Sequence, residues 1–104
     1  MVEKIVYLAT AVHDLKAIYN FIAEDSVKYA QLEVKKIKAY AESLVYHPTK
    51  GRYYKTVKGK TIGSVNFKSY IIFYHISDVE QIQVLSIHHH ARSIANDPAF
   101  NDED

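Results

Sequence analysis

The segment Tyr70-Ile71-Ile72-Phe73-Tyr74 decides the fold that we expect for this chain of 104 residues. All five residues are apolar or aromatic, so a β-strand made of them would be hydrophobic on both faces. Such a strand is covered on both sides in stable proteins, which places it inside a sheet and not at its edge. We therefore predict that it is the central strand of the domain.

Two further β-rich segments flank this central strand. Thr61 to Phe67 precedes it, after a turn at Lys58-Gly59-Lys60. Gln81 to His88 follows it, after a turn at Ser77 to Glu80. Short turns join antiparallel neighbours, so the sequence predicts a three-stranded antiparallel meander.

The first half of the chain changes from one short strand to a helical period. Ile5-Val6-Tyr7-Leu8 is predicted to be a strand, and Thr10 to cap a helix that runs to about Glu24. Ser26 is predicted to cap a second helix, which ends before His47-Pro48 because a residue preceding proline disfavours helical geometry. The apolar faces are Ala11, Leu15, Ile18 and Ile22 in the first helix, and Val27, Ala30, Val34, Ile37, Ala41 and Leu44 in the second.

Together these elements predict one α+β domain over residues 1–104. An N-terminal strand leads into an antiparallel two-helix hairpin, which packs on a C-terminal antiparallel β-meander in two layers. A polar, acidic tail is expected from about residue 97. The sheet face opposite the helices is left for that tail or for a partner.

Composition excludes several classes of protein. The chain has no cysteine, which excludes disulfides and thiolate zinc sites. No apolar run approaches the roughly 20 residues that a membrane span requires. The N-terminus lacks the basic-then-apolar layout of a secretory signal, so we expect a cytoplasmic protein that makes no membrane contact.

Positive charge is concentrated between Ser43 and Ser77. That stretch has no Asp or Glu, whereas the rest of the chain carries a net charge of −5. A surface built from it should attract a polyanion or an acidic peptide. The alternative is a pair of solvated strands whose lysines keep an edge soluble. The six cations are Lys50, Arg52, Lys55, Lys58, Lys60 and Lys68.

The run His88-His89-His90 suggests a metal site, which strand geometry disfavours. Alternation sends His88 and His90 to one face and His89 to the other, so at most two ligands converge. If Ile76 pairs with Gln81, His75 lies opposite Ile82 and far from His88. We predict no metal and no cofactor. A strand end with polar side chains, or an anion-binding or acid–base role, stays open.

Several short motifs follow one another along the chain: Ala11-Val12-His13-Asp14-Leu15-Lys16-Ala17-Ile18, Leu44 with His47-Pro48 and Gly51-Arg52, Tyr70-Ile71-Ile72-Phe73-Tyr74, Ile82-Gln83-Val84-Leu85, and His88-His89-His90-Ala91-Arg92. In their order and spacing they resemble the RelE/ParE superfamily of bacterial toxins from type II toxin–antitoxin operons. The resemblance covers roughly residues 5 to 100, and the long hairpin and the ending through Phe100 are closer to the ParE branch.

The resemblance implies three possible functions. A ParE-like toxin would inhibit DNA gyrase by binding, with His88, His90, Arg92 and Phe100 as the target-binding residues. A RelE-like toxin would instead be an enzyme that cuts messenger RNA on the ribosome, with Lys58, Lys60, His90 and Arg92 as its site. The third possibility is an inactive toxin fold that only binds its antitoxin.

Two positions favour the gyrase interpretation. Gly63 and Ile71 stand where the strands of RNA-cleaving relatives commonly carry Arg, so this chain has less charge to stabilise a phosphate in the transition state.

The implied partner is an antitoxin whose acidic, amphipathic segment folds onto the cations Lys50, Arg52, Lys55, Lys58, Lys60 and Lys68. Operator DNA would be contacted only through that antitoxin.

Overall fold

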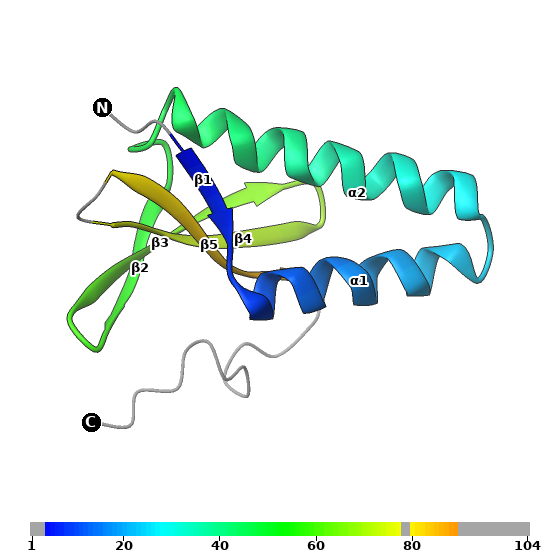
Figure 1. Cartoon of the computed structure of the whole chain (residues 1–104), viewed down its shortest axis with the longest axis horizontal. Coiled ribbons are helices and arrows are strands. Elements are labelled where there is room, and N and C mark those ends of the chain that lie inside the picture. Colours follow the sequence, from blue (N-terminus) through cyan, green and yellow to red (C-terminus); the bar gives the residue numbers. More distant parts are fainter. Residues whose placement is uncertain (1–3, 78–79, 90–104) are drawn as a thin grey trace.

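One five-stranded sheet and a helical hairpin form two layers (Figure 1). The structure is a computed structural model in which residues 4–77 and 80–89 are described. The predicted α+β order of strand, helical hairpin and antiparallel meander is confirmed. The elements are β1 (Lys4–Tyr7), α1 (Ala9–Ala23), α2 (Val27–Glu42), a 3₁₀ turn η1 (Ser43–Val45), β2 (Arg52–Val57), β3 (Lys60–Phe67), β4 (Tyr70–Ile76) and β5 (Gln81–His89).

The strand order β1-β5-β4-β3-β2 puts β4 in the middle of the sheet, as its apolar sequence predicts. The meander has one strand more than predicted, because β2 pairs antiparallel with β3. Its pairing slips between Tyr53 and Lys55, so Tyr54 is an extra residue in the strand. Such a bulge breaks the two-residue period, which explains why the sequence pattern did not define β2.

The outer edge of β5 is hydrogen-bonded first by β1 and then by side chains of α1. β1 runs parallel to β5 as far as the Tyr7–Val84 pair, and the Leu8 amide donates to the Val84 carbonyl at 3.0 Å. Beyond that point the Thr10 hydroxyl donates to the carbonyl of Leu85. One helical turn later, Asp14 Oδ2 accepts from the Ile87 amide at 3.0 Å.

The predicted N-cap at Thr10 is therefore wrong. The helix begins at Ala9, and its N-cap residue Leu8 makes no side-chain capping bond. The Thr10 hydroxyl is used on β5 instead.

The second predicted cap is confirmed, because Ser26 Oγ accepts from the Tyr29 amide at 3.1 Å. Neither described helix is long and apolar enough to cross a membrane.

The core lies mainly between the helices and the sheet. Ile37, Ala41 and Leu44 of the predicted helical seam are fully buried there, together with Ile72 of β4 and Val84 of β5. A smaller cluster lies on the other face of the sheet, around Phe73, which is only 1% exposed. Val57, Ile62, Ile71 and Leu85 pack with it.

The far end of the hairpin extends beyond the sheet (Figure 1). Val27, which the sequence assigns to the buried seam, is 53% exposed there, so that part of the prediction is wrong. Phe21 and Tyr29, close to the same end, are 76% and 69% exposed. The predicted helical period of α2 is correct, but the sheet does not extend far enough to cover the first turn of that helix.

We expect Ile37→Ala to lower the free energy of unfolding by about 2–5 kcal/mol, because it empties part of a closed core. Leu32→Ala is the matched control on the same helix, since Leu32 has the same number of carbon atoms and is 42% exposed. It should cost about 1 kcal/mol or less. Urea unfolding of both variants checks this, and equal losses would contradict the packing of α2.

Candidate functional site

β5 ends in two histidines whose side chains lie on opposite faces of the sheet. His88 pairs with Ile71, is 4% exposed, and packs edge-on against Phe73 with ring centroids 5.8 Å apart. His89 pairs with Tyr70 and packs edge-on against its ring at 5.7 Å on the helix-covered face. The predicted alternation is confirmed for these two residues. His90, Arg92 and Phe100 lie outside the described residues.

The expected position of His75 is wrong by one residue. Ile76 pairs with Ile82, so His75 lies opposite Gln83 and not opposite Ile82. The cause is a connection one residue longer than expected, in which the Ser77 amide donates to the Gln81 carbonyl at 2.9 Å. Over residues 4–77 and 80–89, no three His, Cys, Asp or Glu side chains are grouped in a way that would hold a metal ion.

The six cations of the basic stretch do not form one surface. Lys68 lies in the turn between β3 and β4, where its Nζ forms an ion pair with Glu33 of α2 at 3.0 Å. Lys58 and Lys60 lie at the other end of β3, and Lys55 is half-buried on β2. The six cations are close together in the sequence, but the eight-residue strand β3 separates them in space.

His88 and His89 lie at the end of the sheet opposite to Lys60, whereas His75 Nδ1 lies 2.9 Å from the carbonyl oxygen of Thr61, next to Lys60. His88 pairs with Ile71, which pairs with Asn66 of β3. Lys60 is six residues from Asn66 along that strand, which corresponds to roughly 20 Å at about 3.3 Å per residue.

The two positions that depart from RNA-cleaving relatives face different sides of the sheet. Gly63 pairs with Tyr74, and a Cβ atom on Gly63 would lie 3.3 Å from the Tyr74 ring, on the helix-covered face. An Arg at position 63 would not share a face with His88. Ile71 lies directly beside His88 and packs in the Phe73 cluster, so an Arg at position 71 would be on the same face as His88.

Lys50 and Arg52 line a small polar pocket where α2 meets β3. Its volume is about 130 Å³, and Tyr40, Ser64, Val65 and Asn66 complete the lining. The Lys50 ammonium lies 4.6 Å from the centroid of the Tyr40 ring, a cation–π distance.

The loop that contains Lys50 and directly precedes Arg52 is held by a buried phenol. The Tyr74 hydroxyl donates to the Pro48 carbonyl and accepts from the Gly51 amide, each at 3.0 Å. A Cβ atom on Gly51 would lie 2.3 Å from that hydroxyl oxygen, so only glycine allows this approach. Burial raises the pKa of Tyr74, opposed by the Gly51 hydrogen bond, and the phenol therefore stays a neutral donor at ordinary pH.

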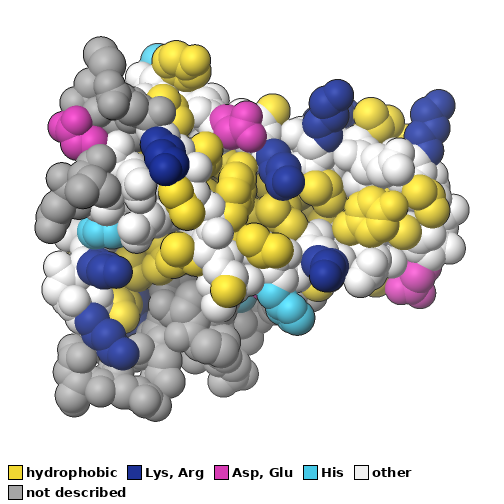
Figure 2. All heavy atoms as spheres, viewed as in Figure 1, with side chains coloured by type: hydrophobic (Ala, Val, Ile, Leu, Met, Phe, Trp, Pro, Cys, Tyr) yellow, Lys and Arg dark blue, Asp and Glu magenta, His cyan; other side chains and the backbone are white. Residues whose placement is uncertain are grey.

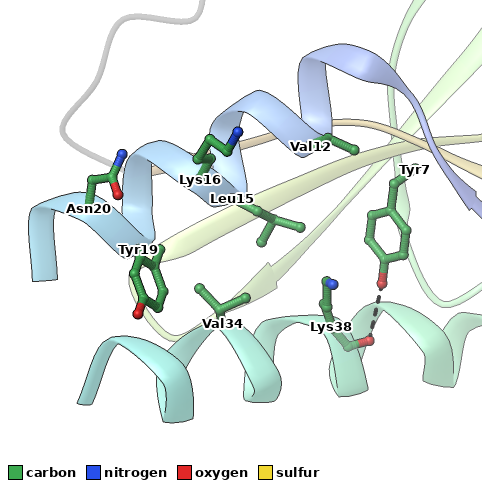
Figure 3. A pocket seen from close by; sticks show the side chains of 8 residues that line it. All are labelled: Tyr7, Val12, Leu15, Lys16, Tyr19, Asn20, Val34 and Lys38. Carbon is green, nitrogen blue, oxygen red and sulfur yellow. Dashed lines mark hydrogen bonds between the residues drawn. The ribbon is translucent and has the colours of Figure 1, made fainter. Parts of the chain in front are cut away.

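A second, larger groove of about 440 Å³ lies along the helical hairpin (Figure 3). Leu15 and Tyr19 from α1 and Val34 from α2 project into the space between the helices, and Tyr7 closes one end. Val12, Lys16, Asn20 and Lys38 complete the lining, so the groove is apolar inside and basic at its margin. Figure 2 shows hydrophobic side chains along both helices with cationic side chains around them, and the cations of the two helices are all lysines.

Tyr7 links the groove to the sheet. Its hydroxyl donates to the Lys38 carbonyl at 3.4 Å. Burial, with a smaller contribution from the Glu42 carboxylate, raises the pKa of Tyr7 to about 12.

Neither the groove nor the pocket is predicted as a site by the sequence alone. Both are formed by residues far apart in the chain, such as Tyr7 with Lys38 and Tyr40 with Ser64. Only the cations of the pocket carried a signal in the sequence, through their place in the basic stretch.

Two solved structures have a similar fold. A chain of the chromosomal ParDE toxin–antitoxin system from P. aeruginosa gives a TM-score of 0.69 at 18% identity, covering 85% of this chain and 96% of the other. A chain of the toxin–antitoxin complex RelBE2 from Mycobacterium tuberculosis gives 0.55 at 19% identity, covering 86% and 99%. The fold is therefore RelE/ParE-like.

The family within that class follows from the sequence. The profile of the family described as the ParE toxin of the type II toxin-antitoxin system, parDE, matches residues 5–94. That is most of the chain, which therefore belongs to the ParE toxin family. No curated protein sequence matches it.

The raised pKa of Tyr7 predicts how stability changes at high pH. The folded chain keeps the phenol proton more strongly than the unfolded chain, so stability should fall between about pH 10 and about pH 12. The measurement is the difference in unfolding free energy between the natural chain and Tyr7→Phe across that range. The contributions of the other titrating groups are the same in both chains and cancel in this difference. A difference that stays constant would contradict the burial of Tyr7.

Because Tyr74 and Gly51 are in contact, we expect the effects of substituting the two residues on stability to be non-additive. Tyr74→Phe should cost about 1–3 kcal/mol, because the Gly51 amide and the Pro48 carbonyl lose their partner. Gly51→Ala should also destabilise, and the double variant should lose less than the sum of both. Thr49→Ala, exposed in the same loop, is the control and should change little. Strict additivity in urea unfolding would mean that the two residues act independently.

Proposed function

We propose that this chain inhibits DNA gyrase by binding and is neutralised by a cognate antitoxin, and that it acts in the cytoplasm. Family membership and fold make it a toxin of the ParE type. One observation favours a binding poison over a nuclease. The face of β4 that carries Ile71 and Phe73 is an apolar cluster, and His88 is buried against it.

A ribonuclease of this size would require a different surface. A general base must reach the ribose hydroxyl, and cations must surround the phosphate on which charge develops. His88 is 4% exposed, and Lys58 and Lys60 lie at the other end of β3. These positions support inhibition by contact, in which His88, His90, Arg92 and Phe100 form or support the surface that meets gyrase.

The groove on the hairpin supports the proposal of an antitoxin partner. Apolar side chains line its interior, and Lys16 and Lys38 lie at its margin. An amphipathic segment with apolar residues on one side and acidic residues on the other is complementary to such a groove.

Induction of the chain alone in bacteria tests the proposal. We expect growth arrest, gyrase-dependent double-strand breaks and intact messenger RNA, with growth restored by the adjacent small reading frame. Arg92→Ala should abolish the breaks while the antitoxin still co-purifies, and Lys36→Ala, exposed on α2, is the matched control. Transcripts cleaved within minutes, with chromosomal DNA intact, would support the ribosome-dependent nuclease instead. Normal growth with soluble protein would leave a fold that only binds its antitoxin.

A further inference from the structure

We infer that the C-terminal segment of this chain, residues 91–104, docks on the Phe73 face, which is the face of the sheet that the helices leave uncovered. The sequence leaves that face to the tail or to a partner, and the burial and charge of the described residues favour the tail. The position of the segment does not depend on the proposed function, whereas its role in meeting gyrase rests on that function.

Side chains on the Phe73 face are buried, although both helices pack on the other face. Phe73 is 1% exposed, Ser86, which pairs with it, is 0% exposed, and His88 is 4% exposed. The Tyr54 ring packs against Phe73 with centroids 4.8 Å apart. Tyr54 lies on β2, three strands from β5, so it does not account for the burial of Ser86 and His88. Such burial indicates a further layer over this part of the sheet.

The C-terminal segment is long enough to form that layer. Residues 1–3 and 78–79 directly precede Lys4 and Glu80, which lie at the Gln81 end of β5, because Lys4 pairs with Gln81. His88 is seven residues further along β5, roughly 20 Å away, whereas three residues span at most about 11 Å. The 15 residues that follow β5 span up to about 50 Å.

The charge of the Phe73 face is complementary to that of the segment. The pairings of Arg52 with Ser64 and of Ser64 with Phe73 put the Arg52 side chain on this face. Lys55 is on the same face, because it pairs with Ile62 of the Phe73 cluster. The segment has one cation, Arg92, and four acidic residues, which are Asp97, Asp102, Glu103 and Asp104.

The order of residues along the segment matches the order of properties across the face. Ile94 and Phe100 come before the acidic end. On the sheet, the apolar side chains of Ile71 and Leu85 lie on β4 and β5, and the cations lie on β2. About three strand spacings of about 4.8 Å separate β5 from β2, so the segment can cross the whole face. Docking in this direction holds Arg92 and Phe100 on the same surface as His88.

A spin label on the segment tests its position. The chain has no cysteine, so Asn101→Cys carries a single nitroxide label. In the full chain labelled with nitrogen-15, we expect this label to broaden the amide signals of Ser64, Asn66 and Ile71. The signals of Val12 and Lys16 in the groove should not change. The same label at Lys36→Cys, exposed on α2, is the control and should not broaden the signals of the Phe73 face.

A mixed sample separates this docking from an association of two chains. Chains labelled with nitrogen-15 but without a nitroxide are mixed with nitroxide-labelled chains of natural isotope content. Broadening of the Phe73 face in that mixture would assign the face to a second copy and overturn the inference. Broadening confined to the groove, or spread evenly over the chain, would also overturn it.

The contribution of charge is measured on the same Asn101→Cys chain. Glu103→Gln with Asp104→Asn should reduce the broadening, as should about 1 M salt, in which the Debye length is about 3 Å. Glu24→Gln with Asp25→Asn removes the same two charges from the exposed tip of the hairpin and should leave the broadening unchanged. Equal effects of the two pairs would contradict the charge complementarity on which the inference depends.

These measurements use neither gyrase nor the antitoxin, so they can fail separately from the proposed function. A chain that shows the expected broadening but does not arrest growth would contradict the proposed function and support the docked segment. A chain that arrests growth without that broadening would support the toxin function and overturn the inference.

Discussion

The arrangement of the whole domain depends on how the outer edge of β5 is hydrogen-bonded. β1 satisfies the first part of that edge in parallel, as far as Val84. Thr10 and Asp14, one helical turn apart on α1, then satisfy the carbonyl of Leu85 and the amide of Ile87. Because unpaired backbone groups are costly when buried, this ladder fixes α1 against β5 directly after the strand ends. The position of α1 in turn sets that of α2, of the groove between the helices and of the sheet face that stays uncovered.

The two faces of the sheet consequently have different properties. The helix-covered face holds the main core and both buried tyrosines of β4, Tyr70 and Tyr74. The other face has a small apolar cluster around Phe73, with His88 packed against its edge. The face on which a residue lies therefore decides what it can contact: Gly63 lies beside the Tyr74 ring on the helix-covered face, whereas Ile71 lies beside His88 on the other face.

The cations of the basic stretch are separated in space by the length of the strands that carry them. Six cations within one stretch of sequence end up at the two ends of β3, on β2 and in a pocket beside α2. Each position offers a different interaction. Lys68 forms an ion pair within the fold, whereas the Lys50 ammonium lies over the Tyr40 ring, beside a loop whose backbone is hydrogen-bonded by Tyr74. Local arrangement therefore matters more for recognition here than the net charge of the stretch.

The sequence by itself determined the central strand, the helical hairpin and the alternation of His88 and His89, because these follow from local periodicity and the direction of neighbouring side chains. It did not define β2, because the bulge at Tyr54 breaks the period, and it assigned Thr10 to a helix cap although β5 uses that hydroxyl. It also placed Val27 in the core, since a period cannot tell where the sheet ends. The groove, the pocket and the Tyr74 contact were decided only by tertiary structure, because each joins residues that are distant in the chain and meet only when the helices pack on the sheet.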